Sequence, residues 1–433
     1  MAVIWNPAAE CQPLAVRAAV QEARLREAVA WARERVPFYR ERLGGVDVRG
    51  LADLPSLPFV RKPDLREHYP FGLFAVPRDE VARIHGSSGT KGKPTVVGYT
   101  REDLDVWREV MARAMVAAGA RPGDCLQIAF GYGLFTGGLG FHDGAERIGM
   151  TVVPTSSGNT ARQSLLLRDF RPAGLAATPS FALHIGETLA ESGTAPGDLG
   201  LRYGMFGAEP WTEQMRRALE AALGCPAWDI YGLSEIIGPG VAGECEARRG
   251  LHVADDHFLP EIVDPATGAV LPPGAEGELV LTTLTKRAQP MIRYRTGDVT
   301  ALDTEPCACG RTSARIARLK GRCDDMLVIK GVNVYPSEIE AALLGVPDLL
   351  PQYQLVVDRR ATLPRLEVQV EPAPSLLARC GGEVAGHPLA AGLRKDAAAR
   401  LRAALGLGVE VTLVAPRTIP RSEGKAVRVV ERT

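Results

Sequence analysis

The chain has 433 residues, more than a single hydrophobic core normally serves, so two or three domains are expected. Hydrophobic residues make up 46% and charged residues 24% of the sequence, as in ordinary globular proteins. Because 51 basic residues balance 51 acidic ones, no overall positive field favours nucleic acid or an anionic membrane as a partner. An anionic ligand must therefore be held by a local site.

The first residues, MAVIWNPAAECQPLAVR, lack the basic and long apolar regions of a secretory signal. No later run approaches the roughly 18 apolar residues that a membrane span needs. Eight cysteines, most of them separate, argue against a disulfide framework. We therefore expect a cytoplasmic protein with no membrane partner.

The first predicted element is an amphipathic helix over 14–43, ended by Gly44 and Gly45 and followed by a proline-rich connector. From about residue 100, helical stretches alternate with short β-rich runs, a pattern that predicts a parallel sheet covered by helices. These runs are LQIAF from 126, MTVVP from 150, GLAATP from 174, LRYGMFG from 201 and WDIYG from 228.

Between residues 257 and 300, strand-like runs are separated by Pro-Gly turns, which favours a β-rich subdomain. The segment MLVIKGVNVYP from 326 opens a further unit, with helices at 336–345 and 388–405 and strands near 353 and 366 and at VEVTLVAP. We predict an α/β fold with a large N-terminal domain of several subdomains over 1–322 and a small α+β domain over 323–433.

The sharpest local motif is HGSSGTKGKPTVVGYT at 85–100. Small residues let the backbone approach an oxyanion, while hydroxyls, backbone N–H groups and lysines supply what a polyphosphate needs. The spacing of glycine and lysine does not fit a Walker A loop, and Pro94 follows the lysine. The alternative is a flexible turn. The candidate phosphate-binding residues are Ser87, Ser88, Gly89, Thr90, Gly92 and Lys93.

Further segments follow in order: FGAEP at 206–210, YGLSEIIGPGVAGEC at 231–245, YRTGD at 294–298, GRCDDMLVIKGVNVYPSEIE at 321–340 and RTIPRSEGK at 417–425. Together with the loop, they resemble the motifs of the adenylate-forming superfamily of acyl-CoA synthetases. The resemblance is greatest to phenylacetate-CoA ligases, which share YGLSE followed by GPGVA, the LTTLTKRAQPMIRYRTGD stretch and the IPRSEGK ending. It implies the adenylate-forming enzyme fold, with a mobile C-terminal domain.

The resemblance also implies a nucleotide site. The FGAEP residues Gly207, Ala208, Glu209 and Pro210 would line the adenine slot, and Tyr231, Gly232 and Ser234 would lie beside them. Glu235 would hold Mg²⁺, because a hard cation bound to phosphates prefers carboxylate oxygen. The alternatives are an ordinary strand-to-helix turn for FGAEP and a surface carboxylate for Glu235.

Further implied positions lie later in the chain. Asp298 would anchor the ribose hydroxyls, since a carboxylate accepts two hydrogen bonds at once. Arg322 would meet phosphate or ribose oxygens, with Arg318 nearby in the nucleotide site. A structural salt bridge is the competing interpretation for Asp298 and Arg322. Asp324 matches the family's hinge, and the Gly331 loop would be presented to CoA.

Lys425 is the implied catalytic residue of the first step, together with Glu235 and Thr90. A cation that bridges the carboxylate and the α-phosphate stabilises charge that grows in the transition state. Acid and MgATP would give acyl-AMP, and rotation of the C-terminal domain would then admit the CoA thiol. The alternatives are an enzyme that passes the acyl group to a carrier-protein thiol or an amine, and a nucleotide-binding protein without activity. The resemblance also suggests a homodimer.

The segment 131–149 is implied to line the acid pocket. Phenylacetate-CoA ligases carry a small residue at the position of Phe141 and an aromatic one at that of Asp143. Phe141 should shorten the pocket and favour a benzoate-like acid. Asp143 would need a partner, either a hydroxyl or amino group of the substrate or an arginine such as Arg147. The candidate pocket residues are Tyr132, Phe135, Gly140, Phe141, His142, Asp143, Ile236 and Pro239.

A second candidate site is a metal centre. Cys307 and Cys309 form a close pair, and Cys245 and His252 stand upstream. Three thiolates and one imidazole would complete a tetrahedral zinc site. The spacing is not that of a common zinc finger, so packed free cysteines are the alternative.

Overall fold

The computed structural model describes residues 3–87, 94–323, 325–329, 332–358, 360, 365–384 and 386–432. Within these ranges, none of the helices combines the length and the apolar character needed to cross a bilayer. Some residues with predicted roles lie outside the described ranges, and their roles stay predictions. They are Ser88, Gly89, Thr90, Gly92, Lys93, Asp324 and Gly331.

The N-terminal segment forms α1 (Pro7–Glu10), α2 (Leu14–Arg35) and α3 (Pro37–Arg42). The prediction of one helix over 14–43 is therefore wrong at one point. Val36 is extended (φ −114°, ψ 116°) because the residue before a proline is kept out of the helical region. The connector that follows carries η1 (Leu51–Ser56), α4 (Lys62–Glu67) and η2 (Arg78–Glu80).

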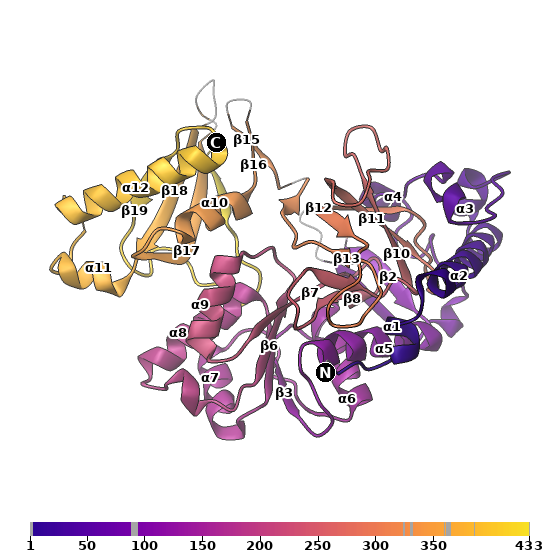
Figure 1. Cartoon of the computed structure of the whole chain (residues 1–433), viewed down its shortest axis with the longest axis horizontal. Helices are drawn as coiled ribbons and strands as arrows, with labels where there is room; N and C mark the ends of the chain where they lie inside the picture. Colours follow the sequence, from indigo (N-terminus) through magenta and orange to yellow (C-terminus); the bar gives the residue numbers. More distant parts are fainter. Residues whose placement is uncertain are drawn as a thin grey trace.

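The predicted alternation of helices and strands forms a parallel sheet. Its strands are β3 (Cys125–Ile128), β4 (Thr151–Val153), β5 (Gly174–Ala177), β6 (Tyr203–Gly207) and the start of β7 (Ala227–Leu233). Every residue of β5 and β6 is buried, as in strands covered on both faces. Helices α5 (Arg101–Ala117) and α6 (Gly137–Ile148) pack together on one side, and α7 (Thr160–Phe170), α8 (Pro179–Glu191) and α9 (Glu213–Leu223) lie on the other (Figure 1).

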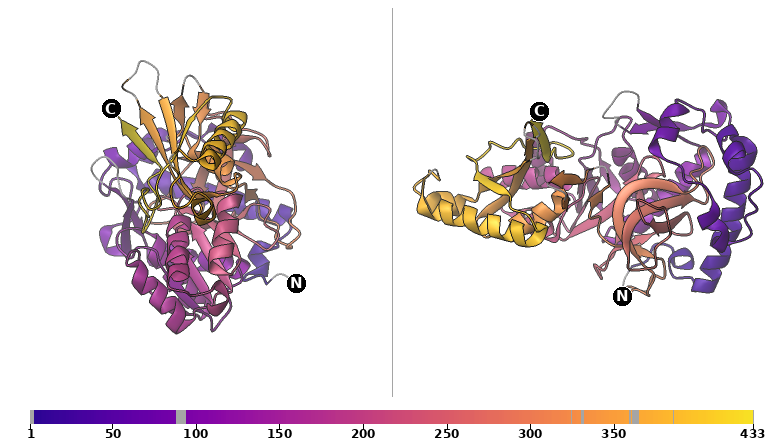
Figure 2. Two further views of the ribbon diagram at one scale, coloured as in Figure 1. Left: turned by 90° about the vertical axis from the view of Figure 1, so that its left-hand side faces the viewer. Right: turned by 90° about the horizontal axis from the view of Figure 1, so that it is seen from above.

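The predicted β-rich region belongs to the same sheet. It extends antiparallel from β7 through β8 (Gly238–Glu244), β9 (Leu251–Val253), β13 (Arg315–Ile316), β12 (Tyr294–Asp303), β11 (Glu276–Thr283) and β10 (Phe258–Val263), with β14 (Gly321–Arg322) paired to β12. This part is strongly curved (Figure 2). A separate hairpin pairs β1 (Arg83–Ser87) with β2 (Thr95–Tyr99), so the predicted phosphate loop connects two antiparallel strands.

The C-terminal part has its own sheet, in the order β19-β18-β17-β20, with strands β17 (Leu349–Asp358), β18 (Arg365–Pro372), β19 (Glu410–Leu413) and β20 (Val429–Arg432). Its helices are α10 (Pro336–Leu344), α11 (Pro374–Arg379) and α12 (Pro388–Leu405), and β15 (Leu327–Ile329) pairs with β16 (Val332–Val334). It has a hydrophobic cluster of its own, separate from those of the large part. A large N-terminal part and a small C-terminal part are therefore present, side by side along the molecule (Figures 1 and 2).

Candidate active site

A cavity of about 430 Å³ lies where the carboxyl ends of β6 and β7 meet the C-terminal part. Ligands of open α/β sheets bind at such strand ends. The cavity brings together a large share of the predicted residues, although they come from all parts of the sequence. They are Ser87, Phe135, Phe141, Gly207, Ala208, Glu209, Pro210, Tyr231, Gly232, Ser234, Glu235, Pro239, Asp298, Arg318, Arg322 and Lys425.

The FGAEP turn leaves β6 in a conformation that requires small side chains. A β-carbon on Gly207 would lie only 2.2 Å from the carbonyl oxygen of Ile230. Ala208 has a φ of +70°, in the left-handed region that larger side chains rarely adopt. The turn therefore presents backbone, with little side-chain bulk, to the cavity, as a flat ring requires.

Glu209 connects this turn to the C-terminal tail. Its carboxylate accepts hydrogen bonds from the backbone N–H groups of Ser180, at 2.7 Å, and Ala426, at 2.9 Å. Ser180 lies in the first turn of α8, where a negative charge also suits the helix dipole. Glu209 thus fixes the backbone of the residue next to Lys425.

Tyr231, Asp298 and Arg322 form a polar group on one wall. The Tyr231 hydroxyl donates to one carboxylate oxygen of Asp298 at 2.6 Å, and Arg322 donates to the other at 3.2 Å. Burial raises the pKa of Tyr231 well above its usual value, so the hydroxyl keeps its proton. Asp298 and Arg322 do form an ion pair, but they form it at the cavity wall, where both can also reach a ligand.

Arg318 has a different setting. It lies within 3.3 to 3.8 Å of the carboxylates of Glu213, Asp229 and Glu244. Burial and the nearby Glu244 charge raise the pKa of Asp229 to about 6. Arg318 therefore balances the charge of these acidic residues at the edge of the cavity.

Glu235 is buried and lies at the mouth of the predicted phosphate loop. The Ser87 hydroxyl donates to its carboxylate at 3.4 Å, and the Lys62 ammonium lies 4.0 Å away. The backbone carbonyl of Glu235 accepts a hydrogen bond from Lys286 at 3.2 Å. A carboxylate beside a phosphate loop is the donor type that Mg²⁺ prefers.

Lys425 enters the cavity from the C-terminal tail. It is open to the cavity yet surrounded by protein, and desolvation lowers the pKa of its ammonium group. The charge of Arg322 lowers this pKa further, while Glu209, Asp298 and Glu235 oppose the change. The ammonium nitrogen lies 5.6 Å from the centre of the Phe135 ring. Lys425 therefore faces both the polar wall and the aromatic end of the cavity.

The tail around Lys425 is tied to the large part on both sides. The Thr160 hydroxyl donates to Glu423 at 2.9 Å, and the Thr178 hydroxyl donates to the carbonyl of Gly424 at 2.8 Å. Together with the Glu209–Ala426 bond, these contacts fix three of the residues that flank the lysine.

The apolar end of the cavity is lined by Phe130, Phe135, Phe141 and Pro239. Phe141 stacks on Phe130 with ring centres 5.3 Å apart and planes 12° apart, and it is almost fully buried. A β-carbon on Gly140 would lie 2.7 Å from both Pro239 and Trp107, so the glycine lets α6 pack closely behind this wall.

Five predicted pocket residues do not line the cavity: Tyr132, Gly140, His142, Asp143 and Ile236. Asp143 is paired with Arg83 at 2.7 Å, whereas Arg147 approaches Glu109 instead. Of the two partners considered for Asp143, a substrate group or an arginine, the structure has an arginine, but it is Arg83 from β1 and not Arg147. With that partner, Asp143 needs no polar group from a substrate.

Sequence reasoning missed several residues of the cavity. Lys62, Phe130, Thr136, Trp211, Tyr294 and Thr296 also line it. Phe130 directly precedes the segment 131–149, which was expected to line the acid pocket, so its position in the sequence could have indicated its role. Lys62 carries no such signal, since it precedes Glu235 by a long stretch of chain and meets it only through the fold.

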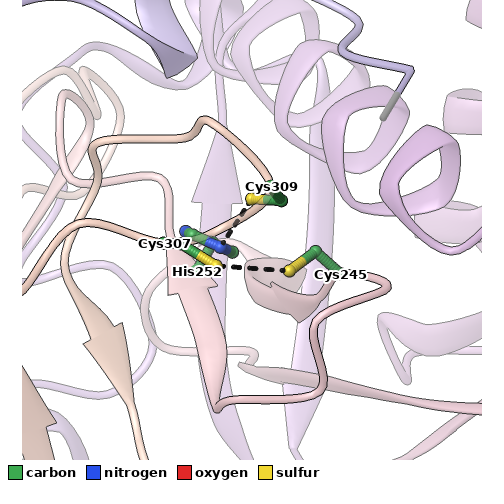
Figure 3. Close-up of side chains that lie close together, drawn as sticks. All are labelled: Cys245, His252, Cys307 and Cys309. Atoms are coloured by element: carbon green, nitrogen blue, oxygen red, sulfur yellow. Dashed lines mark hydrogen bonds between the residues drawn. The ribbon is translucent and has the colours of Figure 1, made fainter. Parts of the chain in front are cut away.

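The four predicted metal ligands lie together, and none of them lines this cavity. The potential ligand atoms of Cys245, His252, Cys307 and Cys309 all lie within 4.8 Å of one another, and all four residues are buried (Figure 3). The cysteines are free of disulfides.

Comparisons with known proteins show the family to which the chain belongs. The family model for AMP-binding enzymes matches residues 48–285, and that for the C-terminal domain of AMP-binding enzymes matches residues 331–433. The chain therefore belongs to the AMP-binding, adenylate-forming enzyme family. Within this family, it is an AMP-forming acid-CoA ligase that resembles phenylacetate-CoA ligases.

Three relatives make this resemblance specific. Phenylacetate-coenzyme A ligase of Thermus thermophilus is 53% identical over 98% of both chains. The enzyme of the same name from Aromatoleum evansii is 50% identical over 96% of this chain and 94% of its own. That of Escherichia coli is 48% identical over 95% of this chain and 94% of its own.

Two solved structures show one similar enzyme in two different states. 2-Hydroxyisobutyryl-CoA ligase in the postadenylation state with 2-HIB-AMP is 33% identical and superposes with a TM-score of 0.92, covering 99% of this chain and 92% of its own. In the thioesterification state with CoA, the same enzyme gives a TM-score of 0.72 over 98% and 91%. The arrangement of this chain is thus closer to the first state.

Proposed function

We propose that the enzyme activates phenylacetate, or an arylacetate with one unsubstituted ring, as its adenylate and then its CoA thioester. The observation that carries this proposal is one continuous cavity with an aromatic end at Phe141 and a polar end at Lys425 and Asp298. The names of relatives at 47–53% identity support the choice of acid.

A hydroxy- or aminobenzoate is a weaker candidate. Two arguments favoured it, a pocket shortened by Phe141 and a buried Asp143 in search of a partner. The second argument does not hold, because Asp143 is paired with Arg83 and lies outside the cavity lining. The aromatic end otherwise offers ring edges and faces, which bind an unsubstituted ring without unpaired polar groups. Phe141 still shortens this end, so we expect poor activity with bicyclic acids.

In the adenylation step, a carboxylate oxygen of the acid attacks the α-phosphorus of ATP, and the bond to pyrophosphate breaks. Lys425 would bridge the two anionic groups and stabilise the charge that develops between them. Asp298 would accept hydrogen bonds from ribose hydroxyls, held in place by Tyr231 and Arg322. Glu235 would hold Mg²⁺, which supplies charge neutralisation of the phosphates in this family.

The second step needs a different arrangement of the C-terminal part. In the described arrangement, Lys425 lies in the cavity, and the similarity to a postadenylation state supports its assignment to the first step. We propose that rotation near Asp324 withdraws Lys425 and admits CoA beside the Gly331 loop. The thiol then attacks the acyl carbon, and AMP leaves.

A substrate panel tests the proposal. Acid-dependent ATP–pyrophosphate exchange and CoA thioester formation should be highest with phenylacetate, and lower with benzoate, 2-aminobenzoate, 3-hydroxybenzoate and 1-naphthylacetate. A benzoate that outperforms phenylacetate in both assays would contradict the choice of acid. AMP release with a carrier-protein thiol or an amine, but not with CoA, would instead favour the alternative acceptors. The need for ATP and CoA makes the cytoplasm the compartment that we propose.

A further inference from the structure

The cysteine–histidine cluster lies in the large part, where two separate segments of chain meet (Figure 3). Cys245 directly follows β8, and His252 lies in β9, next to it in the sheet. Cys307 and Cys309 lie in the loop between β12 and β13. None of the four residues is more than 8% exposed, so the cluster is shielded from water.

Two distances between the ligand atoms match those of a tetrahedral metal site, and the four atoms all lie within 4.8 Å of one another. The sulfur atoms of Cys245 and Cys307 are 3.8 Å apart, and the sulfur of Cys309 lies 3.4 Å from Nε2 of His252. Zinc–sulfur and zinc–nitrogen bonds of about 2.0 to 2.3 Å place the corners of a tetrahedron about 3.3 to 3.8 Å apart. A disulfide needs about 2.05 Å between sulfurs, so the cluster is not a cross-link.

The surroundings also orient the ligands. Nδ1 of His252 lies 3.0 Å from the Ser313 hydroxyl, which leaves Nε2 facing the sulfurs. The backbone N–H of Arg311 donates to the sulfur of Cys309 at 3.5 Å. Among the described atoms, Nη1 of Arg311 is buried without a hydrogen-bond partner. A cation beside three sulfurs suits the net negative charge of three thiolates and one divalent ion.

We propose that Cys245, His252, Cys307 and Cys309 bind one structural zinc ion. The four ligands complete the tetrahedron and leave no open position, as in structural rather than catalytic zinc sites. The donor set of three thiolates and one imidazole favours zinc among the common divalent ions. The proposal is independent of the acid that the enzyme activates.

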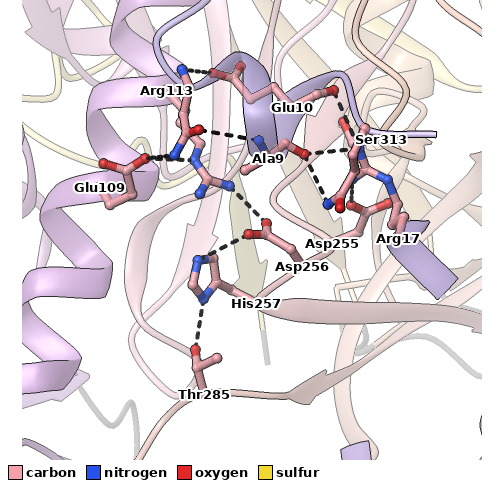
Figure 4. A network of polar contacts seen from close by, with 12 residues as sticks. Ala9, Glu10, Arg17, Glu109, Arg113, Asp255, Asp256, His257, Thr285 and Ser313 are labelled. Atoms are coloured by element: carbon pink, nitrogen blue, oxygen red, sulfur yellow. Dashed lines mark hydrogen bonds and ion pairs between the residues drawn. The ribbon is translucent and has the colours of Figure 1, made fainter. Parts of the chain in front are cut away.

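The proposed ion would also fix the N-terminal segment. The β12–β13 loop carries Arg311 and Thr312 next to the ligands, and Arg311 donates to Glu10 at 2.6 Å. The Thr312 hydroxyl accepts from Arg17 at 2.8 Å, and Arg17 is also paired with Asp255 in a buried network (Figure 4). Zinc would therefore hold the loop in the position that α1 and α2 require.

The test is metal analysis of the full chain after washing with a chelator that does not unfold it. We expect one zinc per chain in the unaltered protein. Cys307→Ser and Cys309→Ser should each lose at least half of the bound zinc. Cys380→Ser is the matched control, because Cys380 is also buried and lies 3.4 Å from a histidine, His387, yet is remote from the cluster in the C-terminal part. It should keep all of its zinc.

Two further measurements keep the test decisive. Cobalt exchanged into the unaltered protein should give the strong visible absorption of tetrahedral thiolate coordination, and the cysteine variants should lack it. Removal of zinc should speed proteolytic cleavage before residue 17. Clearly substoichiometric zinc in washed, folded protein, stoichiometric iron in its place, or full zinc retention by the folded Cys307 and Cys309 variants would overturn the proposal. Pyrophosphate exchange reports on the ligase function separately.

Discussion

At the residue scale, the site depends on polar side chains that hold one another before any ligand arrives. Tyr231 is a clear example, because its hydroxyl donates to Asp298 at 2.6 Å inside the protein. A hydrogen bond to a charged group contributes about 1.5 to 3 kcal/mol. Its loss should therefore alter the position of the carboxylate that we assign to the ribose.

We expect Tyr231→Phe to raise the KM for ATP about tenfold, since about 1.4 kcal/mol corresponds to one factor of ten. Steady-state kinetics with saturating acid measures this change. Tyr39→Phe is the control, because Tyr39 is equally buried but donates to the carbonyl of Pro290. It should lower stability and leave the KM unchanged. Equal KM values in both variants would contradict the role of the Tyr231–Asp298 bond.

The pKa of Lys286 is altered by its burial in the fold, and nothing in the sequence marks this lysine as different from the others. Burial lowers the pKa of its ammonium group to about 8, although Asp103 and Glu235 oppose the change. In the unfolded chain, the pKa is about 10.5, so the unfolded state binds more protons between these two values. The free energy of unfolding should therefore rise with pH in this window.

Lys286→Met removes this titration. At pH 7 the free energy of unfolding of the variant should exceed that of the unaltered protein. This difference, which we call the gap, should narrow by about 2 kcal/mol by pH 9.5, because the unaltered protein gains about 1.4 kcal/mol per pH unit above 8. Denaturant unfolding at the two pH values measures the gap. A gap that widens with pH would show that Lys286 is charged and stabilising in the fold.

At the scale of elements, the sequence predicted regular segments well and long-range contacts poorly. The predicted helix over 388–405 matches α12, because proline at its start and glycine after its end are strong local signals. The β-rich region at 257–300 was visible from its turns, but its membership of the central sheet depends on pairings across the whole chain. The Asp143–Arg83 pair was missed for the same reason, since nothing local links a helix to a strand 60 residues away.

The candidate site shows the same division. Its motif residues could be predicted from the resemblance, and the cavity collects sixteen of them. The contacts that hold the tail, such as Thr160 with Glu423, leave no pattern in the sequence because any hydroxyl and any acid could form them. The roles of the residues outside the described ranges, and the predicted homodimer, stay predictions.

The hydrogen bond between Thr160, the first residue of α7, and Glu423 of the tail leads to a testable prediction. Thr160→Val removes the hydroxyl donor to Glu423 and keeps the shape of the side chain and the longer backbone N–H bond, so it should slow ATP–pyrophosphate exchange about tenfold by loosening the tail that carries Lys425. Thr160→Ser keeps the hydroxyl and is the control. Thioester formation from supplied phenylacetyl-AMP should be unaffected in both. A loss in this second assay for Thr160→Val alone would assign the contact to another step.

At the scale of the whole molecule, the two parts of the chain have separate hydrophobic clusters, which allows one part to move against the other. Polar pairs such as Thr212–Glu340 and Gln352–Glu187 cross the interface between them, and Leu344 of α10 adds one apolar contact to the large part. Polar interfaces of this kind separate more readily than apolar ones. The chain superposes on 2-hydroxyisobutyryl-CoA ligase with a TM-score of 0.92 in the postadenylation state and 0.72 in the thioesterification state. These scores agree with an arrangement that serves the first of the two steps.

Locking this arrangement should separate the steps. With Thr160→Cys and Glu423→Cys joined by a cleavable bis-maleimide, we expect adenylation to continue and thioester formation to stop. Cleaving the linker should restore the thioester step. The two variants that carry only one of these substitutions, treated in the same way, are the controls for reaction at the eight native cysteines. Continued thioester formation by the linked protein would contradict the proposed rotation.

The most direct measurement is the separate assay of both steps in Lys425→Ala, with Lys395→Ala on the exposed face of α12 as the control. Loss of a cation that stabilises transition-state charge should lower acid-dependent ATP–pyrophosphate exchange by at least about 100-fold. Thioester formation from supplied phenylacetyl-AMP and CoA should stay within about twofold of the unaltered enzyme. An equal loss in both steps, or normal exchange, would contradict the assignment of this cavity to the adenylation reaction.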